Sequence, residues 1–272
     1  MAVRLGVNSN LFSIESMRPF KLTMTTLFAR KAWILAWMAA LVLPLVLPYI
    51  TPWEANVKLI EPARAQVAWS VAWLVAILWT FTQGARLGEA NSRTGIGAYF
   101  RSAGISRISQ LFQIWAATML YLLPVVVIAL GICLLGAMPA NPGEVGLWVA
   151  TNFQYAALFL LTVAPLGLLA VALGSRFGAL VGYVAPVSLC LYGLYGVGYL
   201  GQMIKLRDNA LLEWIYAFSP HYHLADLTPR LVFKMGSYPS DTFGALVVYF
   251  FGLTLVLAVV SGGIFRTDPL RN

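Results

Sequence analysis

The chain has 272 residues, of which 60% are hydrophobic and only 10% are charged, whereas about a quarter of an average soluble domain is charged. Eighteen Lys and Arg and ten Asp and Glu side chains are too few to cover the surface of a soluble protein of this size. The composition excludes a disordered chain, a basic nucleic-acid-binding module and, with two cysteines, a secreted disulfide scaffold.

Residues 1–31 form an expected cytoplasmic N-terminal segment with an amphipathic helix. Its apolar residues recur at helical spacing and basic residues surround them: Met17, Phe20, Met24, Leu27 and Phe28, with Arg18, Lys21, Arg30 and Lys31. Such a helix lies in the membrane interface. The alternative is a frayed tail in which this spacing has no structural meaning.

Six apolar segments follow, each free of Asp, Glu, Lys, Arg and His over more than the roughly 20 residues that a helix needs to cross the bilayer core. With their polar ends removed they predict spans at 32–50, 66–84, 112–136, 148–173, 179–203 and 243–265. Runs this long and apolar are not barrel strands. The predicted fold is therefore an all-α polytopic membrane protein, with residues 32–265 as one six-span transmembrane domain.

The basic residues predict the orientation of these spans. Twelve Lys and Arg side chains lie on the side of the two termini and six lie on the other side. Because cytoplasmic loops carry the excess of positive charge, both termini are expected in the cytoplasm, including the tail 266–272. The net charge of +8 is thus a topology signal and does not indicate nucleic acid.

The cytoplasmic loop between spans two and three, residues 85–111, combines aromatic and basic side chains. Tyr99 and Phe100 stand among arginines that include Arg101 and Arg107. Such a segment favours docking as a helix into a groove of a partner protein. Equally, it could lie on anionic lipid headgroups, and the residues alone leave both interpretations open.

The last outer connection, residues 205–242, is too hydrophobic for a free loop. The apolar run 211–218 predicts a short helix with Asp208 as its cap. Ser219-Pro220 or Thr228-Pro229 would begin a second helix, which Gly236 would end. We expect both short helices to be tucked into the outer face of the bundle.

The spans lack the groups that drive transport on their own. No ionisable side chain lies inside them, although ion-coupled transporters depend on such groups. The chain also lacks the P-loop pattern G-x-x-x-x-G-K-[ST] and the enzyme motifs H-E-x-x-H and G-x-S-x-G, so it is not expected to be an enzyme. The polar residues in or near the spans are expected to form hydrogen bonds between helices: Thr82, Gln83, Asn152 and Gln154.

One polar cluster in the outer connection contains both histidines of the chain. His221, His223 and Asp226 have a spacing that could hold Zn or Cu. The favoured interpretation is structural, in which these residues cap short helices and bond to loop backbone. No metal is therefore assigned, and a membrane-embedded enzyme or metal-handling protein remains the alternative.

The loop at 85–111 resembles the coupling segment of type-2 ATP-binding-cassette (ABC) export permeases, in which the pattern E-R-x-x-G-T … S-x-P-[IV]-S-R follows span two. Glu89 and Thr94 keep the spacing of Glu and Thr, and the run from Gly104 to Arg107 matches P-[IV]-S-R. The chain departs from the pattern at Arg93, which replaces Gly, at Gly104, which replaces Pro, and in a short insertion between the two halves. The layout resembles this class over the whole chain, and most closely the permeases associated with multi-copper-enzyme maturation or gliding.

The resemblance implies a permease subunit in a bacterial cytoplasmic membrane, paired with a second permease subunit as a homo- or heterodimer. ATP and Mg would be bound by a separate ATPase subunit, so the chain itself needs no cofactor. The expected docking residues are Glu89, Arg93, Thr94, Tyr99, Phe100, Arg101, Gly104, Ile105, Ser106 and Arg107. Ile105 and the two aromatic residues would fill a notch on the ATPase, and Glu89 and the arginines would orient the segment. A structural membrane subunit without transport activity is a further alternative.

Overall fold

The computed structural model describes residues 17–50, 60–206 and 209–268. Every regular element in these ranges is a helix, and six helices are long and apolar enough to cross a membrane. They are Ala32–Ile50, Ile60–Arg93, Arg107–Gly136, Pro142–Phe177, Ala179–Leu206 and Ser240–Ile264. The all-α class is confirmed, and so is the number of helices long and apolar enough to span a membrane, although the second is longer than predicted, at Ile60–Arg93 instead of 66–84. Residues 1–16 of the expected N-terminal segment and 269–272 of the expected tail lie outside the described ranges.

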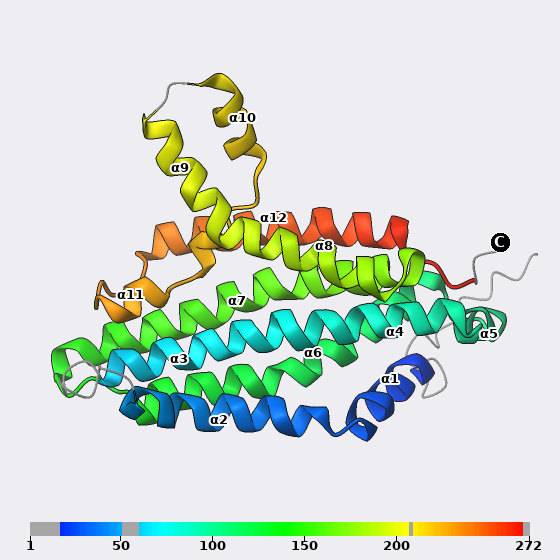
Figure 1. Ribbon diagram of the computed structural model, residues 1–272, viewed down its shortest axis with the longest axis horizontal. Helices are drawn as coiled ribbons and strands as arrows, with labels where there is room; N and C mark the ends of the chain where they lie inside the picture. Colours follow the sequence, from blue (N-terminus) through cyan, green and yellow to red (C-terminus); the bar gives the residue numbers. More distant parts are fainter. Residues whose placement is uncertain (1–16, 51–59, 207–208, 269–272) are drawn as a thin grey trace, which may run out of the picture.

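Three of the six helices long enough to span a membrane consist of more than one helical element, and their arrangement is shown in Figure 1. Helix α1 (Arg18–Ala29) precedes the first span, α2 (Ala32–Ile50). The second and third spans are built from α3 (Ile60–Val75), the π-helix η3 (Ala76–Thr80) and α4 (Phe81–Arg93), and from α6 (Arg107–Gly131) and the π-helix η4 (Ile132–Gly136). The remaining spans are α7 (Pro142–Phe177), α8 (Ala179–Leu191) with the π-helix η5 (Tyr192–Gly196) and α9 (Val197–Leu206), and α12 (Ser240–Ile264).

Helix α7 is the centre of the bundle and packs against α4, α6, α8 and α12. Its contact with α4 depends on glycine, because a Cβ on Gly174 would lie 2.2 Å from the Ala85 carbonyl oxygen and one on Gly88 would lie 2.1 Å from that of Val171. Such close backbone approach is typical of helices that pack in lipid. On the far side of the bundle, α12 presents exposed side chains such as Val248 and Val259, which suits a lipid-facing helix.

Part of the predicted loop 85–111 is helical instead. Helix α4 continues the second span without a break as far as Arg93. The reason is that residues 85–93 have a face that packs on the bundle, on which Ala85, Gly88 and Ser92 are buried. The connection is therefore confined to residues 94–106, which we call the elbow, and it contains the short helix α5 (Ile96–Ser102).

The outer connection differs from expectation in its first half. Helix α10 (Ala210–Phe218) has no buried residue and, with α9, stands away from the bundle (Figure 1), so it is not tucked into the outer face. We call α9 and α10 the arm. The cap of α10 is Asn209, whose side chain accepts a hydrogen bond from the Leu211 amide at 2.9 Å; the expected cap, Asp208, lies outside the described residues. The second half does pack on the bundle, as the 3₁₀ turn η6 (Tyr222–Ala225) and α11 (Thr228–Val232).

The bundle has two distinct ends. Helices α1 and α5 lie at one end together with the C-terminal residues, and α11 lies toward the opposite end (Figure 1). We call these the α5 end and the α11 end. Each carries a cluster of polar side chains, and the two clusters are the candidates for a functional site.

Candidate functional site

The elbow at the α5 end makes two sharp backbone turns. Gly95 has φ +77° directly before α5, and Gly104 has φ +85° after it. This left-handed conformation favours glycine because it lacks a Cβ. Ser106 then caps α6, since its hydroxyl accepts a hydrogen bond from the Ser109 amide at 3.2 Å. The sequence Gly-x-x-Arg that resembles a transporter motif thus has a local structural role, because it turns the chain and begins the third span.

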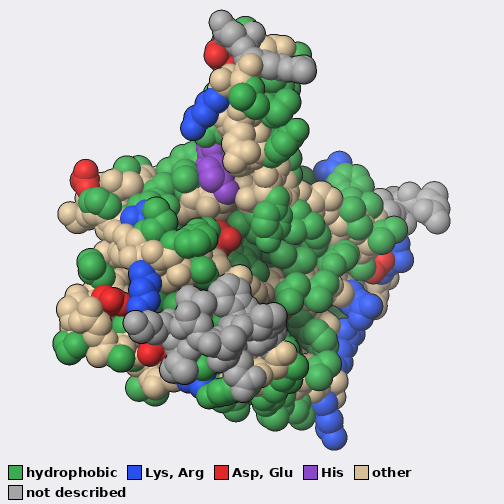
Figure 2. Space-filling model, turned by 60° about the vertical axis from the view of Figure 1, so that its left-hand side comes forward, with side chains coloured by type: hydrophobic (Ala, Val, Ile, Leu, Met, Phe, Trp, Pro, Cys, Tyr) green, Lys and Arg blue, Asp and Glu red, His purple; other side chains and the backbone are tan. Residues whose placement is uncertain are grey.

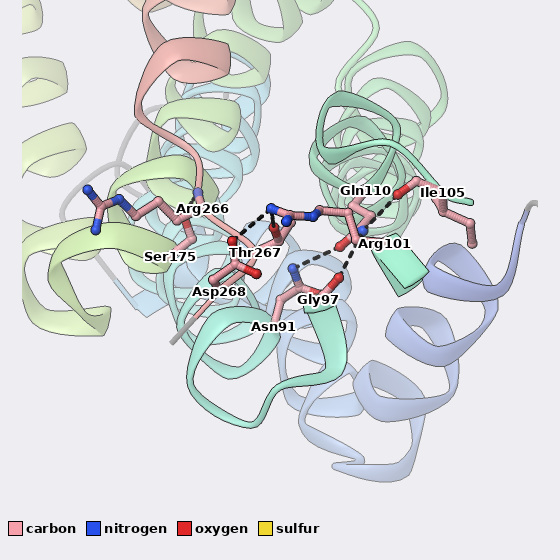
Figure 3. A network of polar contacts seen from close by, with 9 residues as sticks. All are labelled: Asn91, Gly97, Arg101, Ile105, Gln110, Ser175, Arg266, Thr267 and Asp268. Atoms are coloured by element: carbon pink, nitrogen blue, oxygen red, sulfur yellow. Dashed lines mark hydrogen bonds and ion pairs between the residues drawn. The ribbon is translucent and has the colours of Figure 1, made fainter. Parts of the chain in front are cut away.

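Gln110 holds the two halves of the elbow together (Figure 3). This fully buried side chain donates from Nε2 to the carbonyl oxygens of Gly97 and Ile105, both at 3.1 Å. Its Oε1 accepts a hydrogen bond from Asn91 Nδ2 at 3.2 Å. One amide therefore joins α4, α5 and α6, and it satisfies the carbonyl oxygens of Gly97 and Ile105.

The C-terminal residues after α12 fasten the elbow from outside (Figure 3). Arg101 forms an ion pair with Asp268 at 2.7 Å and donates to the Thr267 hydroxyl at 3.3 Å. Directly before these two residues, the Arg266 amide donates to the hydroxyl of Ser175, in α7, at 2.9 Å. Arg107 donates to the Gly262 carbonyl at 3.2 Å, inside α12 itself. Arg101 thus connects the elbow to the residues that follow α12, and Arg107, the first residue of α6, connects α6 to α12 itself.

The structure divides the expected docking residues into buried and exposed ones. Phe100 and Ile105 are 5% and 7% exposed and pack inside this chain. This burial corrects the expectation that they fill a notch on a partner, because their surface is already in contact with the protein's own helices. Tyr99, in contrast, is 60% exposed. The remaining exposed members of the expected set are Arg93, Thr94, Arg101, Gly104, Ser106 and Arg107.

Glu89 is partly buried and pairs with Arg93 one turn along α4, with 2.7 Å between Oε1 and Nη1. The neighbouring Thr94 hydroxyl donates to the Ala90 carbonyl at 2.7 Å and so ends the helix. The two residues that carry the first half of the resemblance therefore shape the end of α4. Arg93 keeps most of its side chain exposed, at 66%.

At the α11 end, a carboxylate reaches the interior of the bundle from a connecting segment. Asp226 Oδ1 accepts hydrogen bonds from the hydroxyl of the fully buried Tyr155, in α7, and from the Thr228 amide at 3.0 Å. The Tyr155 hydroxyl in turn accepts the indole N–H of Trp73 at 3.1 Å. The side chains of α3, α7 and the segment before α11 thus form one network, which we call the Tyr155 network.

The two histidines lie at the root of the arm (Figure 2). Their ring centroids are 5.6 Å apart, and the His221 amide donates to the Tyr249 hydroxyl at 3.0 Å. Burial lowers the pKa of His221, and burial together with the neighbouring His221 ring lowers the pKa of His223. The fold therefore disfavours the protonated form of both groups.

These contacts do not support the alternative of a metal site. Within the described residues no group of three His, Cys, Asp or Glu side chains is placed to hold a metal ion. Asp226 instead accepts hydrogen bonds from the Tyr155 hydroxyl and from the amide of Thr228, the first residue of α11. The structural interpretation of this cluster, which the sequence favoured, accounts for the observed contacts of Asp226.

Three participants in these networks are not identified by the sequence. Gln110 lies at the polar start of the third span, Asp268 is expected only as a charge of the tail, and Tyr155 lies in an apolar run. The sequence could have indicated such residues only where an amide or hydroxyl side chain interrupts an apolar helix face. Even there it does not show which residue the side chain bonds to.

No family model, no curated protein and no solved structure matches this chain. The elbow is therefore characterised by its own geometry: two glycine turns, an amide that joins three helices, and the exposed side chains of Tyr99 and Arg101.

Proposed function

We propose that this chain is the membrane-spanning permease subunit of an ATP-driven ABC transporter of the type-2 export class, and that its elbow docks on a separate ATPase subunit. In this proposal the α5 end faces the cytoplasm of a bacterium, in agreement with the excess of Lys and Arg on the side of the termini. The ATPase subunit binds ATP and Mg, and a second permease subunit completes the complex.

The observation that carries the proposal is the contrast between the fixed backbone of the elbow and its exposed side chains. Gln110 joins the elbow to α4 and α6, Arg101 joins it to Asp268 just after α12, and Arg107, the first residue of α6, bonds to α12 itself. A push on the exposed ring of Tyr99 is therefore passed to three spans, whereas a loose loop would absorb it. This is the property that a coupling element requires.

The proposed mechanism follows from these connections. When two ATPase subunits close on ATP, each moves the elbow of the permease subunit that it holds. The linked helices α4, α6 and α12 then tilt as a unit, and access to a path between the two permease subunits changes. Tyr99 is the main docking side chain in this scheme, and Arg93, Arg101 and Arg107 are exposed basic side chains of the same expected docking set.

The test is reconstitution of the chain with its ATPase partner and replacement of one exposed tyrosine. Tyr99→Ala is expected to lower the ATPase stimulation by about thirtyfold, because a central aromatic contact in an interface contributes about 2 kcal/mol. The matched control is Tyr199→Ala on the arm, since Tyr99 and Tyr199 are 60% and 61% exposed.

Equal stimulation by the Tyr99→Ala protein and the wild-type protein would overturn docking through the elbow. Failure of any P-loop ATPase to copurify with the wild-type chain would remove the transporter proposal as a whole. If both variants lose the stimulation, the loss comes from a general effect of the substitutions on folding. That outcome would also count against specific docking through Tyr99.

A further inference from the structure

A cavity at the α5 end combines two arginines with apolar walls. It has a volume of about 130 Å³ and lies between α1, α4, α5 and the start of α6. Its walls include Leu22, Ile96, Phe100 and Ile114, and Arg30 and Arg86 also line it. One water molecule needs about 10–15 Å³ by this measure, so the space is large enough for a phosphate group and the atoms next to it.

The cavity is positively charged. No Asp or Glu is among the described residues that line it. The Arg30 guanidinium donates to Gln83 Oε1 at 3.1 Å, which positions it over α4. Arg86 has neither a hydrogen bond nor an ion pair with any described residue, so its five donors are available to a ligand.

The position of the cavity fits a ligand from the membrane. Helix α1 lies beside the bundle just before the first span (Figure 1). Its side chains Leu22 and Phe28 are exposed. Trp33 follows it and donates its indole N–H to the Phe28 carbonyl at 3.2 Å, and tryptophan is typical of the level of lipid headgroups. Arg86 lies on the second span, where that helix continues beyond its apolar run.

We propose that this cavity is a binding site for the phosphate headgroup of an anionic phospholipid. Arg30 and Arg86 bind the phosphate oxygens, since guanidinium groups form paired hydrogen bonds with phosphate. The glycerol ester region lies on the apolar wall, and the acyl chains remain in the bilayer because the cavity is too small for them. The bound lipid then joins α1 to the elbow through Ile96 and Phe100.

The inference does not depend on the transporter proposal, because it uses only the cavity, its charge and its place beside the spans. The test uses the full chain in a neutral detergent and measures Tm and bound lipid by native mass spectrometry. Phosphatidylglycerol is expected to raise Tm by about 3 °C more than phosphatidylcholine does. In the Arg30→Gln/Arg86→Gln protein its binding is expected to be about tenfold weaker.

The matched control is Lys31→Gln/Arg176→Gln, which removes two charges that belong to the same end of the chain's topology but do not line the cavity. It should bind the lipid as the wild-type protein does. A loss equal to that of the cavity variant would show general attraction of anionic lipid and would overturn the site. A second variant, Ala90→Leu, keeps both arginines and narrows the cavity, and undiminished binding to it would also contradict the proposal.

A third measurement separates the two sources of phosphate. Glycerol phosphate and inorganic phosphate carry the same anionic group without acyl chains. If either stabilises the wild-type protein as much as phosphatidylglycerol does, the site is one for a soluble anion and the lipid proposal is wrong. Stabilisation by the lipid alone supports it.

Discussion

The two ends of the bundle use polar side chains in opposite ways. At the α11 end, Asp226, Tyr155 and Trp73 bond to one another inside the bundle. At the α5 end, buried Gln110 bonds to backbone carbonyls, and the charged side chains of the elbow remain exposed. The polar groups of the Tyr155 network are thus enclosed by the fold, whereas Arg101 in the elbow pairs with Asp268 and still keeps about half of its side chain, 52%, exposed to a partner.

The largest predicted effect tests the division of the elbow into buried and exposed residues. Phe100→Ala removes a ring that is 5% exposed, and it should lower the free energy of unfolding by about 3–5 kcal/mol. Unfolding of the purified protein in mixed detergent, followed by circular dichroism, measures this change. Tyr99→Ala should change it by less than about 0.5 kcal/mol, since exposed positions tolerate substitution. Equal losses in the two variants would contradict the division.

The next effect concerns the Tyr155 network. Asp226→Ala leaves the Tyr155 hydroxyl and the Thr228 amide without their shared acceptor. The Tyr155 hydroxyl keeps the Thr228 hydroxyl as a partner at 2.8 Å, so the main cost is one unsatisfied amide, and the free energy of unfolding should fall by about 1–3 kcal/mol. Asp226→Asn keeps one oxygen acceptor and should lose much less, which the same unfolding titration measures. If Asn and Ala are equally destabilising, the carboxylate has a role other than that of an acceptor.

The fold was predictable wherever composition alone decides. The absence of charge over long runs identified the six spans, since lipid admits no other element there. The arm was not predictable, because an apolar helix such as α10 has the same composition whether it packs on protein or faces lipid. The helical continuation to Arg93 was missed for the opposite reason: polar residues 85–93 look like a loop until their buried face is known.

The polar residues of the spans illustrate what one sequence can say about pairing. Asn152 does join two helices, because its Oδ1 accepts the indole N–H of Trp69 at 3.0 Å. Gln83 accepts from Arg30 and Gln154 bonds to the backbone of Tyr238, so both connect a helix to a neighbouring segment. Thr82 donates to the Leu78 carbonyl in its own helix, and the expectation of an interhelical bond was wrong. A threonine hydroxyl can donate to the backbone carbonyl four residues earlier in its own helix. The longer side chains of Asn and Gln carry both a donor and an acceptor, and these are less often both bonded within one helix.

A smaller effect is expected from the histidines at the root of the arm. An unfolded histidine has a pKa of about 6.5, and burial holds the pKa of His221 and His223 below that value. The unfolded chain therefore takes up protons first as the pH falls, so stability is full above about pH 6.5 and declines below it. The Tm should drop between about pH 8 and about pH 5.5.

The His221→Gln/His223→Gln protein isolates the contribution of these two groups. Its Tm should fall less over the same pH interval, because the groups whose pKa differs between the folded and the unfolded state have been removed. Carboxylates that titrate at lower pH contribute equally to both proteins and cancel in the comparison. An identical pH dependence in the two proteins would show that neither histidine is held neutral by the fold.

The smallest effect returns to the α5 end and to a position where the chain departs from the transporter pattern. Arg93 forms an ion pair with Glu89, but its side chain is 66% exposed, and such pairs contribute about 0.3–0.5 kcal/mol within a helix. Arg93→Gln should therefore leave the unfolding titration almost unchanged. If Arg93 also belongs to the docking surface, the same variant should lower ATPase stimulation, and increasingly so at low salt, where exposed charges attract most strongly. A substantial loss of stability would instead show that the Arg93–Glu89 pair stabilises the fold. Arg93 would then resemble the residues of the Tyr155 network and would not support the contrast between the two ends of the bundle.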